Sequence, residues 1–497
     1  MQLADLLVQH DTLRCFHLVF LSLLCLPISL TIVCVCLCYQ RYIGTGETSV
    51  NDASPRQTVL VTGVGMAKGL TLARAFYSSG HRVIGADAED GISPCAGRFS
   101  RSLSVFYKLR RPLSSEDPKI YVDRLVRIVK AEKVDLWVSC SAVTSALDDA
   151  RAKAAIEEQT KCKCIQFDVP TTSMLDEKYE FMRACQQRSL PVPETHFVAS
   201  QNDVSRILSA SMTARSDRRY ILKPVGVDDV NRGNMTLLPL PSQQQTLDHI
   251  SRLPITHSKP WILQQFIAGN EYCTHALVVR GEVRCFVACP SAEMLMHYKP
   301  LSPDSWLWKA MLQFTVDFVD RSLHCRQMTG HLSFDFIAEH GEIYAIECNP
   351  RAHTAVVLFG GQSNESQKMV QEYLAATTNT ELQDGLAKGS SPEESGNDMS
   401  SLVIPAAKTQ PRYWIGHDLV SFLYLLFGGT GIKHCIAELS TLIVHIATWK
   451  EGTFETWDPL PAFVLYQIYW PLTIISAWWN GRRWSRVNVS TTKMFAC

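Results

Sequence analysis

The sequence carries little charge and no excess of either sign. Charged residues make up 19% of the 497 residues, with 48 basic and 48 acidic side chains. A protein that binds nucleic acid through its phosphates needs a basic excess or a basic patch, so this balance excludes that class. The length allows roughly two to four domains with a large core.

The sequence also lacks the cysteine spacing of a zinc site. Its 17 cysteines are an odd number and are scattered, no pair of Cys-x-x-Cys motifs occurs, and Cys162-Lys-Cys164 does not have the required spacing. We interpret the cysteines as reduced thiols, which is typical of a cytosolic compartment.

One long stretch, residues 18–39, has no charge over 22 residues and is long enough to span a bilayer. A signal peptide is the alternative, but the run is long for its apolar region and no Ala-x-Ala cleavage site follows. We predict a single-pass membrane anchor over residues 1–44 and a linker over residues 45–57.

Residues 58–87 have the pattern of a βαβ unit. A strand at 58–62 leads into a glycine turn, Gly63 to Gly69, then a helix and a second strand that ends at Asp87. The third glycine comes one residue late for a dinucleotide fingerprint, so an NAD(P) site and a Rossmann-like domain that serves another purpose both stay open. Strands and helices alternate as far as residue 167, which predicts a parallel sheet within residues 58–172.

The most informative stretch is a predicted β-hairpin at residues 330–351. Asp335 lies on its first strand, and Glu347 and Asn349 lie two apart on the second, so they face the same side. These side chains supply the hard oxygen ligands that Mg²⁺ prefers together with substrate phosphates, and Arg351 can clamp a transferring phosphoryl group. The alternative is that these are ordinary solvated strand residues.

Two lysines and a strand end precede the hairpin and fit a nucleotide site. Either Lys178 or Lys223 alone is most typical of a surface cation, but as a set they fit cations that reach nucleotide phosphates. The polar segment 225–234 can fold over a triphosphate. A strand over residues 261–267 offers its backbone edge to adenine, and Glu271 can accept from ribose hydroxyls; the edge residues are Gln265, Phe266 and Ile267.

The last part of the chain is polar and then apolar. Residues 377–408 predict a flexible linker, and residues 409–497 an apolar helical region. Its last helical stretch, 463–479, ends in Trp-Trp-Asn-Gly-Arg-Arg and is short for a span. A span, a core helix and a helix at the membrane surface all stay open, and we favour a second membrane contact at the surface.

These motifs together resemble those of the ATP-grasp ligases, and residues 58–168 resemble the domain that precedes the ATP-grasp fold in them. A closer resemblance is to the ATP-grasp enzymes of mycosporine pathways, which attach glycine to 4-deoxygadusol to give mycosporine-glycine. The motifs that carry it are Ala73-Arg-Ala-Phe, Glu271-Tyr-Cys-Thr-His275, Ala345-Ile-Glu-Cys-Asn-Pro-Arg-Ala-His353 and Arg412-Tyr-Trp414.

The resemblance implies an α/β chain, with a Rossmann-like domain over residues 58–172 followed by an α+β ATP-grasp domain over residues 173–376. It implies ATP as the cofactor, with Mg²⁺, or Mn²⁺ in its place, and a cytosolic catalytic domain. The implied roles are phosphate contacts by Lys178 and Lys223, metal binding by Asp335, Glu347 and Asn349, charge neutralisation by Arg351, and acceptor contacts by His353, Ser291 and Tyr298. The chain departs from the family in lacking a glycine cluster after Lys223, and in having Gln265 where a glutamate is frequent.

We therefore predict an ATP-dependent carbon–nitrogen ligase of secondary metabolism, which acts on a small-molecule acceptor and an amino acid. Glycine and 4-deoxygadusol are the expected pair. Three alternatives stay open: a ligase of another natural-product pathway that forms an amide or peptide bond, a membrane-anchored NAD(P)-dependent reductase, and a nucleotide-binding scaffold without activity.

Overall fold

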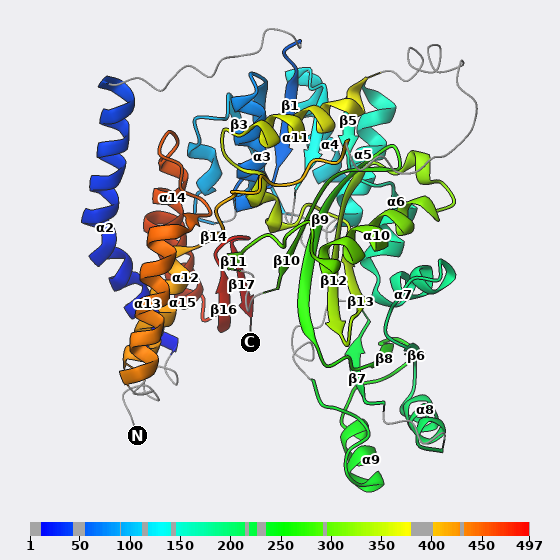
Figure 1. Cartoon of the computed structure of the whole chain (residues 1–497). Helices are drawn as coiled ribbons and strands as arrows, with labels where there is room; N and C mark the ends of the chain where they lie inside the picture. Colours follow the sequence, from blue (N-terminus) through cyan, green and yellow to red (C-terminus); the bar gives the residue numbers. More distant parts are fainter. Residues whose placement is uncertain are drawn as a thin grey trace, which may run out of the picture.

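The computed structural model (Figure 1) describes residues 11–42, 55–89, 91–111, 118–140, 146–213, 218–225, 235–291, 296–378, 401–427 and 432–496. The predicted phosphate loop after residue 225 and most of the predicted linker, residues 379–400, lie outside these ranges.

The first body is a parallel five-stranded sheet with helices on both faces. Its strand order, β3-β2-β1-β4-β5, is that of a Rossmann-like half, and the prediction of a parallel sheet is confirmed. β1 and β4 are apolar and almost fully buried, as expected for a sheet covered on both faces. The strands are β1 (Thr58–Thr62), β2 (Arg82–Ala88), β3 (Val105–Leu109), β4 (Leu136–Ser139) and β5 (Lys163–Ile165), and the helices are α3 (Ala67–Ser78), α4 (Lys119–Glu132) and α5 (Ala146–Gln159).

Two short helices then lead to a small antiparallel sheet of order β6-β8-β7. Glu177 separates the helices, because its carboxylate caps the second one by accepting from the N–H groups of Tyr179 and Glu180. The predicted domain boundary at 172/173 falls inside the first helix. The elements are α6 (Val169–Asp176), α7 (Lys178–Gln187), β6 (Thr195–Val198), α8 (Gln201–Thr213), β7 (Tyr220–Pro224), α9 (Gln243–Ser251) and β8 (Trp261–Gln265).

A four-stranded antiparallel sheet of order β10-β9-β12-β13 forms the third body. Helix α10 (Trp306–Asp320) packs on it through Phe314, whose ring lies 5.3 Å from Phe334 and 5.0 Å from Phe336 between centroids. The β12–β13 turn uses His340 and Gly341, both with positive φ, as a two-residue hairpin turn requires. The strands are β9 (Asn270–Val279), β10 (Glu282–Pro290), β12 (Gly330–Glu339) and β13 (Glu342–Asn349).

The C-terminal part packs back on the first and third bodies. Residues 401–408 belong to this packing, since Val403 pairs with Cys285 of β10 and is buried. A three-stranded sheet of order β11-β14-β15 joins distant segments. The elements are β11 (His297–Tyr298), η4 (Thr354–Phe359), α11 (Asn364–Leu374), β14 (Arg412–Tyr413), α12 (Ile415–Phe427), α13 (Ile432–Thr448), β15 (Lys450–Glu451), α14 (Leu460–Val464), η8 (Leu465–Tyr469), α15 (Trp470–Trp479), β16 (Trp484–Asn488) and β17 (Lys493–Ala496).

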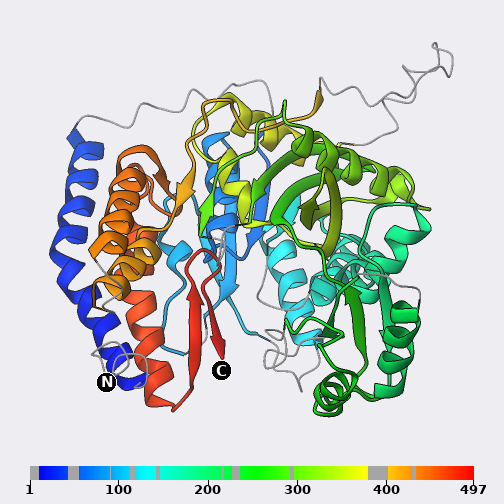
Figure 2. The same ribbon diagram turned by 60° about the horizontal axis from the view of Figure 1, so that its bottom comes forward.

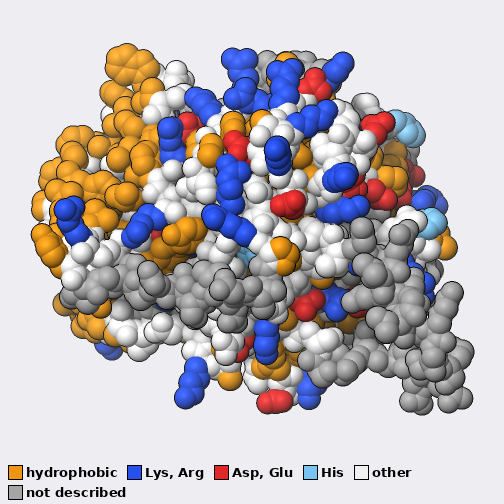
Figure 3. Space-filling model, turned by 90° about the horizontal axis from the view of Figure 1, so that it is seen from above, with side chains coloured by type: hydrophobic (Ala, Val, Ile, Leu, Met, Phe, Trp, Pro, Cys, Tyr) orange, Lys and Arg blue, Asp and Glu red, His pale blue; other side chains and the backbone are white. Residues whose placement is uncertain are grey.

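The predicted anchor is the long helix α2 (Asp11–Tyr42), which lies along α15 (Figures 1 and 2). Ser22 donates to the Tyr466 carbonyl at 3.0 Å, and Arg14 donates to the Ser485 carbonyl at 2.8 Å. Two helices, Thr12–Tyr42 and Leu460–Trp479, are long and apolar enough to cross a membrane by length and composition. Hydrophobic side chains gather at this end of the molecule (Figure 3).

Candidate active site

The predicted metal hairpin forms, and its polar residues meet across it. Asp335 pairs with Glu347 in the β12–β13 register, beside a β-bulge, and Ser333 pairs with Asn349. The Asn349 amide donates to Asp335 Oδ2 at 3.3 Å, and Arg351 donates to Asn349 Oδ1 at 2.8 Å. Two carboxylates, one amide and one guanidinium are thus brought together at the end of one hairpin.

The alternation of the strands explains why these side chains share one face. Phe334 and Phe336 flank Asp335 and are fully buried in the core under α10, and Cys348 beside Glu347 is buried too. Asp335, Glu347 and Asn349 are half-buried on the opposite face. Two half-buried carboxylates and an amide supply hard oxygen ligands, and this chemistry fits a divalent cation.

Lys223 is held in place by a neighbouring strand. Its Nζ donates to Gln264 Oε1 at 2.9 Å, and the Gln264 amide donates to Thr195 Oγ1 at 3.1 Å. In the β7–β8 register Lys223 pairs with Ile262, so Gln264 is its diagonal neighbour on the same face. No role for Gln264 could be predicted from the sequence, because its contact with Lys223 depends on the register of β7 and β8, which no local pattern gives.

The predicted adenine edge lies where β8 ends. The Gln265 N–H donates to the Glu194 carbonyl at 2.8 Å, and the Phe266 N–H donates to the Arg219 carbonyl at 2.7 Å. The Ala268 N–H is taken by Glu339 Oε1 at 2.8 Å. Three N–H groups along this edge are thus used within the protein, and the adenine contact stays a prediction.

Electrostatics place two further acids at the same site. Desolvation raises the pKa of Glu271, Lys223 lowers it and Glu347 raises it again. Desolvation also raises the pKa of Asp176, whose carboxyl is influenced in turn by Arg351, Glu347 and Lys178. The pKa of Glu271 thus responds to Lys223 and Glu347, and the pKa of Asp176 responds to Arg351, Glu347 and Lys178. Asp176 was not predicted as a site residue, because it is the last residue of α6 and belongs to no recognisable sequence motif.

The three predicted acceptor residues fall in two places. The Ser291 N–H donates to the Glu271 carbonyl at 2.8 Å, at the edge of the sheet. Tyr298 is fully buried, with its ring 5.8 Å from His353 and 5.9 Å from Trp414 between centroids. His353 is already engaged, since its Nδ1 accepts from the Ala355 N–H at 3.1 Å and caps η4.

A buried lysine that sequence reasoning missed lies next to this group. Lys68 of α3 is 1% exposed, and its Nζ donates to the Ala352 carbonyl at 2.7 Å. Burial, and then the charge of Arg351, lower its pKa to about 7. This contact joins the first body to the segment that follows the metal hairpin, and no local pattern reveals it.

The glycine turn is closed by the protein itself. Asp87 Oδ2 accepts from the Gly65 N–H at 2.6 Å, and the Ala67 N–H donates to the Ser490 carbonyl at 2.9 Å. A side chain at Gly97 would collide with the Val64 carbonyl at 2.0 Å, so the segment at Gly97 packs directly on the turn. The N–H groups of Gly65 and Ala67, at the place where a pyrophosphate would bind, are thus used within the chain.

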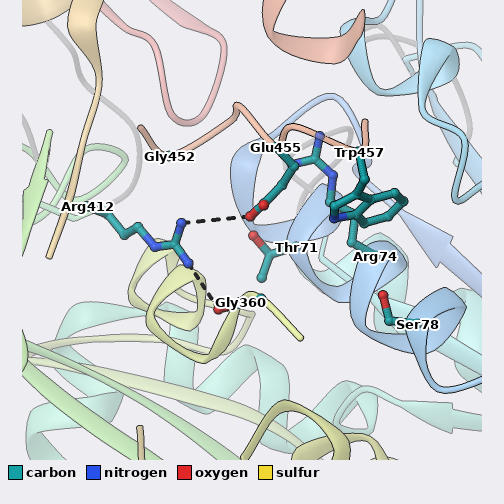
Figure 4. Close-up of a pocket in the computed structure, with 9 residues that line it drawn as sticks. Thr71, Arg74, Ser78, Gly360, Arg412, Gly452, Glu455 and Trp457 are labelled. Atoms are coloured by element: carbon teal, nitrogen blue, oxygen red, sulfur yellow. Dashed lines mark hydrogen bonds and ion pairs between the residues drawn. The ribbon is translucent and has the colours of Figure 1, made fainter. Parts of the chain in front are cut away.

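A separate polar pocket lies between α3, η4 and the C-terminal part (Figure 4). Arg412 donates to the Gly360 carbonyl at 3.0 Å and approaches Glu455 at 3.9 Å. Beside it, Arg74 forms a buried ion pair with Asp458 at 2.9 Å. Arg74 and Arg412, which belong to two of the family-like motifs, therefore join the C-terminal part to the rest of the chain, away from the metal hairpin.

Comparison with known proteins gives structural similarity only. No family model matches the chain, and no curated protein matches it. Solved structures that are similar include an ADP complex of N5-carboxyaminoimidazole ribonucleotide synthetase (16% identity, 64% of this chain and 76% of that chain, TM-score 0.45). A second is an L-amino acid ligase from Bacillus licheniformis, with 14% identity over 65% of this chain and 75% of that chain and a TM-score of 0.45. A third is N5-carboxyaminoimidazole synthetase from Staphylococcus aureus, with 14% identity over 65% of this chain and 77% of that chain and a TM-score of 0.46. Similarities at these values carry no argument about the reaction, which has to come from the site.

Proposed function

We propose that the chain is an ATP-dependent ligase that forms a carbon–nitrogen bond. The observation that carries this proposal is the hairpin itself, in which Asp335 pairs with Glu347 while Asn349 is hydrogen-bonded to both Asp335 and Arg351. Two carboxylates, an amide and a guanidinium at one place suit a metal–triphosphate complex better than they suit a dinucleotide.

The fit of Mg²⁺–ATP follows from the donor set. Asp335, Glu347 and the Asn349 amide oxygen would hold Mg²⁺, and the ion would supply positive charge that offsets the charge of the triphosphate. Lys223 is held by Gln264 as a fixed cation for phosphate, and Lys178 opens α7 as a second. Arg351, oriented by Asn349, is placed to neutralise the transferring phosphoryl group.

The reaction that we propose has two steps. Phosphoryl transfer activates an oxygen of the acceptor, either a carboxylate or an enolised carbonyl. The amine of an amino acid then attacks the activated carbon, and phosphate leaves. The resemblance of the sequence to the mycosporine enzymes supports glycine and 4-deoxygadusol as the pair. An amide-forming ligase with another acceptor is the alternative within the same chemistry.

The closed glycine turn favours the ligase over an NAD(P)-dependent reductase. Asp87 would have to hold ribose in a dinucleotide site, but it accepts from the Gly65 and Ala88 N–H groups at 2.6 and 2.7 Å. The turn would also have to offer N–H groups to pyrophosphate, and the Ser490 carbonyl takes the first N–H of α3. The Asp87 carboxylate and the first N–H of α3 thus already have partners within the protein, which disfavours ribose and pyrophosphate binding there.

A test is ADP release by the full-length protein in detergent, with Mg²⁺, ATP, 4-deoxygadusol and each amino acid in turn. We expect glycine-dependent ADP release and a product of the condensed mass, both lost in Glu347→Gln. Turnover with another amine would support the ligase activity but contradict mycosporine-glycine as the product. No turnover of ATP with any pair, while the mutant binds nucleotide like the parent, would overturn the ligase in favour of the scaffold.

We also infer that the protein contacts a membrane through α2 and the exposed apolar side chains of α13 and α15. α2 has a mean hydropathy of 2.7 in its most apolar window, 6% of which is buried. On α13 and α15, Ile432, Ile436, Ile443 and Trp479 are exposed. Because α15 also contacts the first body, through Thr473 and Ser93 at 2.9 Å, the bilayer would meet the outer face of these helices. Flotation of the full-length protein with liposomes, weakened when Ile436 and Ile443 are changed to Glu, tests the contribution of α13.

A further inference from the structure

A cluster of two histidines and one aspartate lies outside the proposed ATP site. His297 belongs to β11, Asp418 to the first turn of α12 and His445 to the last turn of α13. The neighbours along the cluster are separated by 121 and 27 residues in the sequence. The fold, rather than any local motif, brings the three side chains together.

The geometry centres on the carboxylate of Asp418. His297 Nε2 lies 2.7 Å from Asp418 Oδ1, and His445 Nδ1 lies 2.6 Å from Asp418 Oδ2. One ligand atom from each residue can be chosen so that all three lie within 4.8 Å of one another. Asp418 and His445 are buried, and His297 keeps 24% of its side chain exposed, which leaves one open side.

Aromatic rings form a wall around the cluster. The ring of Trp449 lies 4.3 Å from His445 and 5.7 Å from His297 between centroids, and that of Tyr413 lies 5.6 Å from His445. An apolar shell of this kind limits water around the polar atoms and orients the imidazoles. The rings of Trp449 and Tyr413 therefore pack beside the imidazoles of the cluster.

We propose that His297, Asp418 and His445 form a binding site for one first-row transition-metal ion, of which Zn²⁺ is the representative. Two imidazoles and one carboxylate are the ligand set for borderline metals such as Zn²⁺, whereas Mg²⁺ prefers an all-oxygen set. Three protein ligands leave a fourth position, which the half-exposed side at His297 can supply with water. This site is independent of the proposed ATP chemistry and of its Mg²⁺.

Metal binding would replace two hydrogen bonds by two metal–nitrogen bonds. Each imidazole donates a proton to Asp418 when no ion is bound, and that proton leaves or moves to the other ring nitrogen when the ion binds. Affinity for the ion therefore falls as the pH falls. The bound ion would fasten the α12–α13 hairpin to β11, one residue before the buried Tyr298.

The test uses the full-length protein in detergent, without a polyhistidine tag, after dialysis against a chelator. It is titrated with Co²⁺ alone and with Zn²⁺ alone, against a chromophoric competitor and without nucleotide. We expect one tight equivalent and a visible Co²⁺ ligand-field band without a thiolate charge-transfer band. In Asp418→Asn and His445→Gln the band is lost and the affinity falls by at least about tenfold.

Two controls and a third ligand variant make the result specific. His434→Gln changes an exposed histidine on the same helix α13 and should keep the parent's affinity. Asp335→Asn should also keep the equivalent, which separates this site from the metal hairpin. His297→Gln changes the half-exposed ligand on another element, so a folding failure of one helix variant, seen by circular dichroism, does not block the test.

Two outcomes would overturn the proposal. The first is a parent protein that takes up no tight equivalent, which leaves the cluster as a hydrogen-bonded clamp. The second is an equivalent that persists in the three ligand variants or shows thiolate charge transfer, which places the ion on cysteines instead.

Discussion

Asn349 donates its amide to Asp335 across the hairpin at 3.3 Å while its oxygen accepts from Arg351. One side chain thereby links a proposed metal ligand to the proposed phosphoryl clamp. Asn349→Leu removes both links, and we expect ADP release to fall by about 10- to 100-fold, the usual effect of losing a group that orients a metal site. Steady-state kinetics at saturating Mg²⁺ measure this.

Asn349→Asp is the matched control, because it keeps an oxygen ligand and a partner for Arg351 but places a second carboxylate against Asp335. We expect it to retain more activity than Asn349→Leu at high Mg²⁺. Equal activity in Asn349→Leu and the parent would contradict the assignment of this residue.

Gln264 positions Lys223 and should matter for ATP rather than for the acceptor. Gln264→Leu keeps the volume in the buried strand but removes the oxygen that accepts from Lys223 Nζ. We expect the KM for ATP to rise by about 10- to 100-fold, since a charge-assisted hydrogen bond contributes about 1.5–3 kcal/mol. The KM for the amine should not change, and a rise in both constants would indicate a general loss of structure instead.

Acid should unfold the protein through its buried histidines. Burial, and then Lys68, lower the pKa of His275 to about 3. Between its usual pKa of about 6.5 and 3 the unfolded chain binds a proton that the folded chain does not. Stability from this group is thus complete above about pH 6.5 and falls as the pH drops, by about 1.4 kcal/mol per pH unit for one proton.

The matched variant is His275→Gln, which cannot titrate in this range. Urea unfolding between pH 4 and pH 7 should show a slope lower by about one proton than in the parent. An unchanged slope would show that His275 is protonated in the folded protein.

The buried ion pair of Arg74 and Asp458 should be necessary for stability. Arg74 also donates to the Thr453 and Asp458 carbonyls at 2.8 and 2.9 Å, so its loss leaves several buried acceptors unpaired. We expect Arg74→Met to lower the free energy of unfolding by about 3–5 kcal/mol. The exposed pair of Arg321 and Asp317 is the control, and Arg321→Met should cost less than about 1 kcal/mol. Equal effects of the two variants would contradict this view of the C-terminal attachment.

Local patterns were sufficient for the hairpin and the parallel sheet. The alternation around Asp335 and the two-residue spacing of Glu347 and Asn349 fix which side chains share a face, because a strand has a period of two. β3 was not predicted. The predicted helix 463–479 forms, but it is not α-helical throughout, because Pro471 lies within it. Since proline has no N–H for an α-helical bond, the chain forms the π-helical turn Leu465–Tyr469 before it.

Contacts between distant segments could not be read from the sequence. Lys68 donates to the carbonyl of Ala352. The helix that follows the glycine turn donates to the carbonyl of Ser490, more than four hundred residues further on. The cluster of His297, Asp418 and His445 likewise has no spacing that marks it. These features depend on how the bodies pack, so a pattern search along the chain does not find them.

The packing of α2 on α15 also decides how the protein can be prepared. Cys15, Leu18 and Val19 of α2 cover Ile474, Ala477 and Trp484. Removing the first 44 residues to improve solubility would uncover this second apolar surface and the carbonyl of Tyr466. A shortened chain is therefore expected to aggregate unless detergent or compensating polar substitutions cover the exposed strip, and enzyme assays are best begun with the helix in place.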